Sequence, residues 1–478
     1  MKQVELWSIL DYKNFIYHNE SDLFEIFGHK FQEINRDKFN IFISRKFDFV
    51  HSSKEKRGSL FNIPISIKDN LCTKGILTTC ASKMLKDWIP SYDASVVTFL
   101  KEEQALIIGK TNLDEFAMGN TTETSYFGPT YNPWDSQMRF SPGGSSGGAA
   151  VSVALGYVPV AIASDTGGSI RCPASWTGVL GLKPTYGRVS RFGLVSYSHT
   201  LDQIGILSRY AEDQSKILEI ISRPDPKDMT YENQQFHHES LELTEEISVG
   251  ILPDFFTLIS PMQQEIYSEI IKIFDNHPQI QIEEINIPDW EILLPTYYTI
   301  ASGEAYSNLS RYTGEQYGYS DGDPDLTRLH GFGKEVLKRI QIGKYSLKQG
   351  YDEQLYVKAQ NIRQHFKLFF KSIFHKTTII ALPTMLDVAP TWDELKKPLE
   401  SYQADLLTVP ANLLGIPAIS IPVGFVKKQG VKLPLGLQLY ASWWNERTLL
   451  QIASEIQKVT NFHIQLPPSK RIHEEDTS

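Results

Sequence analysis

The chain has 478 residues, and its 47 lysines and arginines against 56 aspartates and glutamates give a formal net charge of −9. With 41% hydrophobic and 22% charged residues, the composition is that of a globular protein with ample material for a core. The acidic balance, without a concentrated basic face, argues against a chain that binds nucleic acid by itself through phosphate neutralisation.

The cysteines and the apolar runs narrow the class of protein further. Cys72, Cys80 and Cys172 form no CxxC pair, which favours a reducing compartment and argues against a structural zinc site. No run approaches the ~20 apolar residues that cross a bilayer, and the N-terminus lacks a signal-peptide or transit-peptide pattern. We therefore expect no membrane contact and no metal in this chain.

The first part of the chain is predicted to mix helices with short strands. Residues 1–60 are interpreted as a helix-rich lead-in that contains a polar loop at 51–59. Apolar alternation over 63–70 predicts a strand with Lys68 at its end. A helix followed by a short strand is expected between 94 and 109.

The same alternation continues to the C-terminus. A helix over 146–155 is expected to stop at Gly156, and the apolar, largely β-branched residues 158–163 predict a fully buried strand. Ser260, followed by a proline, predicts the start of an amphipathic helix. Further strands are predicted at 247–252, 378–382, 418–423 and 435–440.

No linker rich in Pro, Gly or Ser divides these elements. We therefore predict a single large α/β domain over 61–465, with a mixed central sheet covered by helices on both faces. The divergent lead-in at 1–60 precedes this domain, and a polar tail at 466–478 follows it.

Two segments rich in glycine and serine, 143–148 (GGSSGG) and 165–169 (DTGGS), flank the predicted helix and buried strand. A serine is a poor nucleophile until another group takes its proton, and no histidine lies between 141 and 184. His199 is the nearest downstream, within a polar turn. A lysine whose pKa is lowered by burial can serve instead, and Lys68 is the candidate.

The second segment also offers a row of backbone donors. Consecutive N–H groups in a tight turn can converge on one point, which is how an oxyanion hole is built. The candidate donors are the N–H groups of Thr166, Gly167, Gly168 and Ser169.

Each of these signals has a plainer interpretation when taken alone. GGSSGG is typical of a flexible loop or a phosphate cradle, although the Gly-Lys-Ser/Thr of a P-loop is missing. DTGGS alone is compatible with a simple turn, and Lys68 alone with a solvated strand end. The three together, in this order, are far more specific.

The combination resembles the amidase signature family, whose serine- and glycine-rich motif matches residues 142–171 of this chain. The two serines keep the family's spacing, and Lys68 stands in a strand that ends Lys-Asp-Asn. The resemblance implies that Ser169 is the nucleophile, Ser145 a bridging serine and Lys68 the neutral base. It also implies a cis peptide between Gly144 and Ser145 and an oxyanion hole at the second segment.

Further blocks resemble the branch of this family that hydrolyses glutamine in tRNA-dependent amidotransferases. They lie at 80–85, 114–119, 123–127, 183–193, 300–305, 331–336 and 405–412. This resemblance implies glutamine as substrate, with Arg339 for its carboxylate, Asp405 for its ammonium group and Tyr297 in the same pocket. Arginine suits a carboxylate because its planar fork binds both oxygens. The alternatives are a surface helix charge beside Lys338 for Arg339, and a helix cap for Asp405.

The resemblance also implies partners. Ammonia would pass through a channel to the B subunit of the amidotransferase, which uses ATP and Mg²⁺ to activate glutamate on tRNA(Gln), so this chain itself would hold no cofactor. A small third subunit would contact the N-terminal region. The divergence of 1–60, with a composition rich in Lys, Asn, Ile and Phe, favours an organellar version in the mitochondrial matrix over a bacterial-type cytoplasmic one.

Two other functions fit part of the pattern. One is a stand-alone amidase or esterase that acts on another small amide, against which the charges at Arg339 and Asp405 argue. The other is a non-catalytic scaffold subunit that kept the fold, against which the intact Lys68, Ser145 and Ser169 argue.

Overall fold

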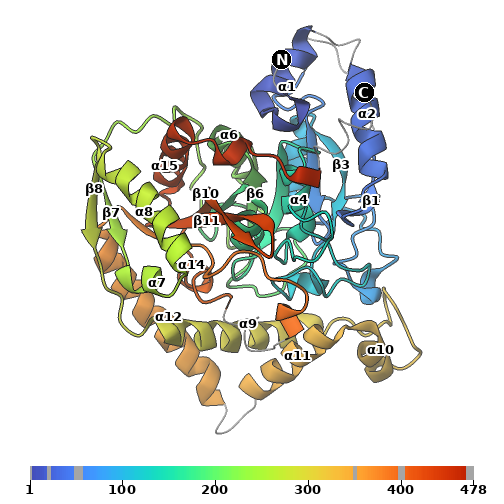
Figure 1. The fold of residues 1–478 in the computed structure, drawn as a ribbon. Coiled ribbons are helices and arrows are strands. Elements are labelled where there is room, and N and C mark those ends of the chain that lie inside the picture. Colours follow the sequence, from blue (N-terminus) through green and yellow to red (C-terminus); the bar gives the residue numbers. More distant parts are fainter. Residues whose placement is uncertain (1–2, 19–22, 48–56, 348–352, 397–403, 470–478) are drawn as a thin grey trace.

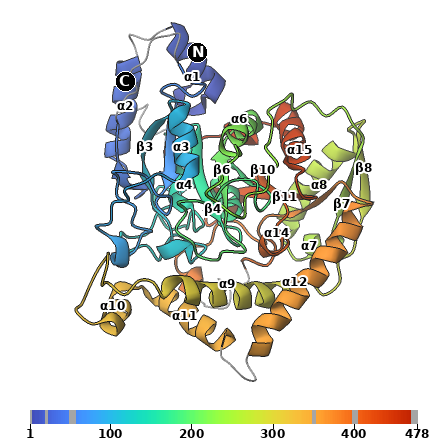
Figure 2. The ribbon, with the colours of Figure 1, turned by 180° about the vertical axis from the view of Figure 1, so that it is seen from behind.

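An 11-stranded mixed sheet runs through the molecule, and helices cover both of its faces (Figures 1 and 2). The computed structural model describes residues 3–18, 23–47, 57–347, 353–396 and 404–469. The strands in chain order are β1 (Phe42–Arg45), β2 (Pro64–Lys68), β3 (Leu106–Thr111), β4 (Val160–Asp165), β5 (Leu180–Lys183), β6 (Gln203–Ser208), β7 (Ile247–Ile251), β8 (Ile280–Glu284), β9 (Ile379–Pro383), β10 (Ala418–Lys428) and β11 (Val431–Ala441). The predicted α/β domain with a mixed sheet is confirmed.

The strand order across the sheet is β1-β3-β2-β4-β6-β5-β10-β11-β9-β7-β8. Strand β2 runs parallel to β3 and β4, whereas β6 is antiparallel to β4 and β5. Strands β10 and β11 form a long antiparallel hairpin, and β7 runs parallel to β8 and β9. Because β2 and β4 are parallel neighbours, Lys68 and Asp165 end at the same edge of the sheet.

Helices of very different length cover the sheet. They are α1 (Ile9–His18), α2 (Leu23–Asn35), α3 (Ser95–Glu102), α4 (Gly147–Ala154), α5 (Arg171–Thr177), α6 (Ala211–Ile221), α7 (Pro253–Thr257), α8 (Pro261–Asp275), α9 (Leu293–Leu309), α10 (Pro324–Gly331), α11 (Lys334–Ser346), α12 (Glu353–Phe374), α14 (Val409–Leu414) and α15 (Glu446–Val459). Short 3-10 turns are η1 (Val4–Leu6), η4 (Lys83–Leu85), η5 (Glu115–Ala117), η6 (Trp290–Ile292), η7 (Glu394–Lys396) and η8 (Phe462–Ile464). No helix among the described residues is long and apolar enough to cross a membrane.

The N-terminal lead-in differs in part from its prediction. It forms the helices α1 and α2, but it also supplies β1, which pairs antiparallel with β3 at the edge of the sheet. This strand has four residues and only its first is buried, so it carries no periodic apolar signal. The predicted loop at 51–59 and the predicted tail at 466–478 lie partly outside the described residues.

Helices α9, α11 and α12 form a layer along one side of the molecule, below the sheet in Figure 1. Helices α9 and α11 approach closely because Gly343 of α11 lies directly against the backbone carbonyl of Ser302 in α9, where a Cβ atom would collide with the oxygen. The α9 side chains Tyr297, Ile300 and Ala301 are buried in the apolar cluster between this layer and the sheet. This arrangement places Tyr297 of α9 against Gly167, in the turn that follows β4.

Candidate active site

Lys68 is fully buried at the carboxyl end of β2, as its place in the sequence pattern predicts. Its Nζ atom lies 2.7 Å from Ser145 Oγ, 2.8 Å from Ser146 Oγ and 3.0 Å from Ser164 Oγ. Burial lowers the pKa of Lys68 to about 7, against the opposing effect of nearby carboxylates such as Asp114. A large part of the lysine is therefore neutral near pH 7, and a neutral amine can accept a proton from a serine.

The first glycine- and serine-rich segment presents Ser145 to this lysine. The peptide between Gly144 and Ser145 is cis, as the family resemblance implies. Gly144 packs so closely on the neighbouring loop that a Cβ atom would collide with the carboxylate of Asp114 and the backbone N of Thr121. This contact leaves no room for a side chain and fixes Ser145 beside Lys68.

Ser169 lies on the turn between β4 and α5, in the second segment. Its backbone carbonyl accepts a hydrogen bond of 3.1 Å from the N–H of Ser146, so the two segments touch each other. Lys68 and Ser145 are fully buried, whereas Ser169 retains 7% exposure. Of the three predicted triad members, Ser169 is therefore the least buried.

Fewer backbone N–H groups are available for the predicted oxyanion hole than the sequence suggested. The N–H of Gly168 donates to Asp165 Oδ1 at 2.8 Å, so this group is already engaged and the prediction is corrected for Gly168. Within the described part of the chain, the N–H groups of Gly167 and Ser169 have no hydrogen-bond partner. These two N–H groups, together with that of Thr166 just before them, remain the candidates.

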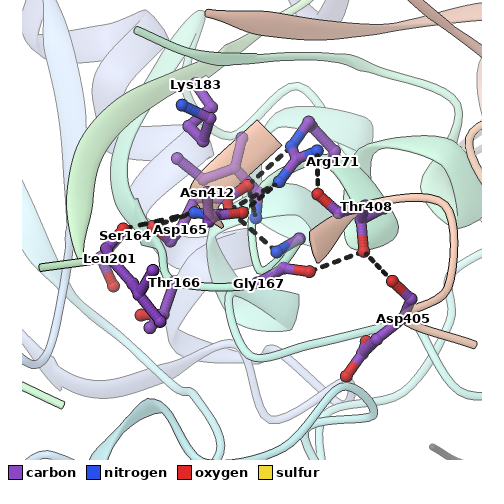
Figure 3. A network of polar contacts seen from close by, with 12 residues as sticks. Ser164, Asp165, Thr166, Gly167, Arg171, Lys183, Leu201, Asp405, Thr408 and Asn412 are labelled. Atoms are coloured by element: carbon purple, nitrogen blue, oxygen red, sulfur yellow. Dashed lines mark hydrogen bonds and ion pairs between the residues drawn. The ribbon is translucent and has the colours of Figure 1, made fainter. Parts of the chain in front are cut away.

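Beneath this turn, Arg171 and Asp165 form a fully buried ion pair (Figure 3). Arg171 donates to both carboxylate oxygens of Asp165, at 2.9 and 3.0 Å, and to the carbonyl of Thr408 at 2.8 Å. Burial alone would raise the pKa of Asp165, but Arg171 outweighs it and holds this pKa at about 2. The carboxylate therefore stays charged and anchors the turn, a role that the sequence pattern did not predict for either residue.

Arg339 on α11 is buried, with 6% exposure, and it faces aromatic side chains rather than solvent. Its Nη1 donates to the Tyr197 hydroxyl at 2.6 Å and its Nε to Glu335 Oε1 at 2.8 Å. The guanidinium carbon also lies 5.6 Å from the ring centre of Tyr298. The alternative of a surface helix charge is therefore wrong, because packing against α9 covers this face of α11.

Asp405 lies just before α14, and its carboxylate points back towards α9. It accepts hydrogen bonds from the hydroxyl of Tyr298 at 2.5 Å and from Asn120 Nδ2 at 3.2 Å. Burial raises the pKa of Asp405 to about 6, while these two donors and Arg339 oppose the shift. The start of α14 is capped by the backbone carbonyl of Asp405, so the alternative of a side-chain helix cap is not supported.

Tyr297 connects this charged pair to the nucleophile turn. A Cβ atom at Gly167 would collide with its phenol group, so the hydroxyl lies directly against the turn. The ring centres of Tyr297 and Tyr298 are 5.0 Å apart. The site thus brings together side chains from residues separated by more than a hundred positions in sequence.

Sequence reasoning missed several members of this site. Ser146 and Ser164 contact Lys68, while Tyr197, Tyr298 and Asn120 contact the charged pair. The sequence held one signal for two of them, which is adjacency to a predicted site residue: Ser146 follows Ser145, and Tyr298 follows Tyr297. The remaining residues are brought in only by tertiary packing.

Comparison with known sequences shows which protein family this chain matches. The family model described as Amidase matches residues 43–450. Curated relatives include the A subunit of glutamyl-tRNA(Gln) amidotransferase from Saccharolobus solfataricus, 45% identical over 86% of each chain. The protein of the same name from Halothermothrix orenii is 42% identical over 90% of this chain and 92% of the relative.

Solved structures agree with the sequence comparison. The crystal structure of the glutamyl-tRNA(Gln) amidotransferase A subunit from Thermotoga maritima matches with a TM-score of 0.82 at 34% identity, over 98% of both chains. A 6-aminohexanoate cyclic dimer hydrolase matches with a TM-score of 0.81 at 23% identity, over 98% of this chain and 99% of that one. The second likeness shows the shared fold alone.

Proposed function

The chain belongs to the amidase family, and on that premise we propose that it is the glutamine-hydrolysing A subunit of a glutamyl-tRNA(Gln) amidotransferase. The observation that carries the proposal is a buried pair of opposite charges connected by two tyrosines to the turn of the proposed nucleophile. Arg339 and Asp405 are both buried and both contact Tyr298, whose neighbour Tyr297 lies against the turn that holds Ser169. A small amide without charged groups could form neither an ion pair with Arg339 nor one with Asp405, so it would gain no binding free energy from these two side chains.

In this proposal, glutamine is oriented by its two charged groups. Its α-carboxylate pairs with the guanidinium of Arg339, and its α-ammonium pairs with the carboxylate of Asp405. Tyr297 lies between these groups and the turn, where it would flank the glutamine side chain. The γ-carboxamide then reaches Ser169, the least buried member of the triad.

The chemistry we propose is a proton relay from Ser169 to Lys68. Neutral Lys68 takes the proton of Ser145, which takes the proton of Ser169 as its oxygen attacks the amide carbon. The N–H groups of Gly167 and Ser169 stabilise the negative oxygen that develops. Collapse of the intermediate returns a proton through Ser145 to the leaving nitrogen, so ammonia departs and a γ-glutamyl ester remains on Ser169. Water then hydrolyses this ester by the same relay in reverse.

The ammonia would be used by a partner, as the names of the relatives imply. We propose that the B subunit of the amidotransferase binds ATP and Mg²⁺ and converts Glu-tRNA(Gln) to Gln-tRNA(Gln), and that a small third subunit completes the complex. The net charge of −9 supports a division in which the tRNA is held mainly by the partners. No cofactor is assigned to this chain.

The location within the cell stays a prediction. The sequence pattern favours the mitochondrial matrix, but the relatives described above are archaeal and bacterial and do not support that location. Fractionation of the source cells, followed by detection of the chain, tests the prediction.

Ammonia release from glutamine by the purified complex tests the proposed function. We expect hydrolysis of glutamine to exceed that of an uncharged amide such as butyramide by at least about 10²-fold, because two charge pairs contribute. Arg339→Met is the matched variant and should lose the part of this preference that the carboxylate pair contributes. Equal or better hydrolysis of the uncharged amide would support the stand-alone amidase instead.

A further inference from the structure

We propose that Thr408 is a positioning residue that holds the Gly167–Gly168 peptide in one orientation and thereby fixes the oxyanion donors. The inference rests on the proposed function, since it takes Ser169 as the nucleophile. Thr408 lies outside both glycine- and serine-rich segments, on the turn that leads into α14. It is fully buried, and its side chain reaches across to the second segment (Figure 3).

The peptide unit between Gly167 and Gly168 is held at both of its polar ends. The Thr408 hydroxyl donates to the carbonyl of Gly167 at 2.6 Å. At the other end, the N–H of Gly168 donates to Asp165 Oδ1 at 2.8 Å. A unit held at the oxygen and at the nitrogen cannot rotate about its long axis without losing both hydrogen bonds.

Such a constraint is needed because both residues of this unit are glycines. Glycine accepts positive and negative φ with similar ease, so sterics alone do little to prevent rotation of a Gly-Gly peptide. Gly168 has φ +133°, a conformation that few other residues adopt. The N–H groups of Gly167 and Ser169 belong to the two neighbouring peptide units, which share Cα atoms with this unit, so holding the unit restricts the backbone rotations that would move these donors.

Gly168 also explains how the threonine reaches its target. A Cβ atom at this position would collide with the side chain of Thr408, so the absence of a side chain creates the space that the hydroxyl and methyl groups fill. The contact is therefore a packed one as well as a hydrogen bond. A substitution that removes the hydroxyl but keeps the packing therefore tests the hydrogen bond by itself.

Thr408 is itself held by groups of the site. Its N–H donates to the carbonyl of Asp405 at 3.1 Å, and its own carbonyl accepts from Arg171 at 2.8 Å. The hydroxyl also lies 3.2 Å from the Asp405 carbonyl, but its single proton is directed at the nearer oxygen of Gly167. One turn thus carries both the carboxylate proposed for the substrate ammonium and the clamp on the nucleophile turn.

Steady-state glutamine hydrolysis by the complex with Thr408→Val tests the clamp, because valine keeps the branched shape and lacks the donor. Removal of a direct oxyanion donor lowers kcat by about 10²–10³-fold, and we expect about tenfold to hundredfold for loss of its support. KM for glutamine should stay within about twofold, since no substrate contact is removed. Thr408→Ser, which keeps the hydroxyl, should restore kcat to within about threefold of the wild-type value.

Three results would overturn the proposal: a Thr408→Val kcat within about twofold of wild type, a defect in KM alone, or equal impairment of Thr408→Ser. Ammonium-supported formation of Gln-tRNA(Gln) reports whether the variant complex assembles. If Thr408→Val does not assemble, Thr408→Ala removes the same donor without the branched shape and carries the same prediction. If the wild-type complex hydrolyses another amide rather than glutamine, the proposed function fails, and the same variants then test the clamp on that amide.

Discussion

We predict that kcat for glutamine hydrolysis rises with pH and has a midpoint near pH 7, because Lys68 must lose its proton before it can act as the base. Burial lowers the pKa of Lys68 to about 7 and neighbouring carboxylates only partly oppose it. The sign follows directly, since the active form is the deprotonated one. Activity is therefore present above the midpoint and is lost as the pH falls through it.

The magnitude of this effect is large. A lysine with an ordinary pKa of about 10.4 is neutral in roughly one molecule in a thousand at pH 7.5. With a pKa of about 7, Lys68 is neutral in about three-quarters of the molecules at that pH. Burial therefore raises the population of the competent base by nearly three orders of magnitude, and below the midpoint kcat should fall about tenfold per pH unit.

The assay is ammonia release at saturating glutamine between about pH 5.5 and pH 8.5. Saturation matters because burial raises the pKa of Asp405 to about 6, and the bound substrate ammonium keeps that carboxylate charged. Lys68→Arg should lower kcat by about 10²–10⁴-fold at every pH, since a guanidinium does not release its proton.

Lys183 provides a matched control. It is also fully buried with a pKa lowered to about 7, but its Nζ donates to the carbonyl of Pro184 and contacts neither serine of the relay. Lys183→Met should leave the midpoint of the profile unchanged. A flat profile between pH 6 and 8, or a midpoint that moves with Lys183→Met, would refute the assignment of Lys68 as the base.

Three further predictions concern the pocket, the turn and stability. Arg339→Lys should raise KM for glutamine by about tenfold or more with a smaller change in kcat, because the ammonium group of lysine cannot replace the planar fork of arginine. An unchanged KM in steady-state kinetics would argue that Arg339 does not bind the glutamine carboxylate. Gly167→Ala should lower kcat/KM for glutamine by at least about tenfold, because its Cβ collides with the Tyr297 phenol, and an unaltered kcat/KM contradicts the placement of this tyrosine. Burial lowers the pKa of Lys183 to about 7 in the folded state, so the unfolded chain binds a proton first and the fold loses stability as the pH falls from about 10.4 towards 7. The melting temperature of Lys183→Met relative to wild type should therefore be higher at pH 6 than at pH 8.5. A difference that does not change with pH refutes this prediction.

The catalytic segments were predictable because their signals are local. The apolar alternation before Lys68 and the apolar run of β4 mark strands, and the glycines mark turns where the backbone approaches other groups. The order of these signals then led to the family. The ends of β2 and β4 also indicated where the catalytic residues lie, since parallel neighbouring strands end at one edge of the sheet.

The pocket could not be derived in the same way. Arg339 belongs to the polar helix α11, and it is removed from solvent by the close packing of α11 against α9, at Gly343 and Ser302, and by its contact with Tyr197. The hydrogen bond from the Gly168 N–H to Asp165 depends on how tightly the turn closes, which the sequence DTGGS does not specify. Strand β1 was missed because a four-residue edge strand has too few buried positions to show a period.

The proposed mechanism depends above all on Ser169, which attacks glutamine and releases ammonia for use elsewhere in the complex. Formation of Gln-tRNA(Gln) by the Ser169→Ala complex, measured first with glutamine and then with an ammonium salt as nitrogen donor, separates these two steps. We predict that the glutamine-dependent reaction is abolished while the ammonium-dependent reaction continues at the wild-type rate. Persistence of the glutamine-dependent reaction would contradict the mechanism, because another residue would then be the nucleophile.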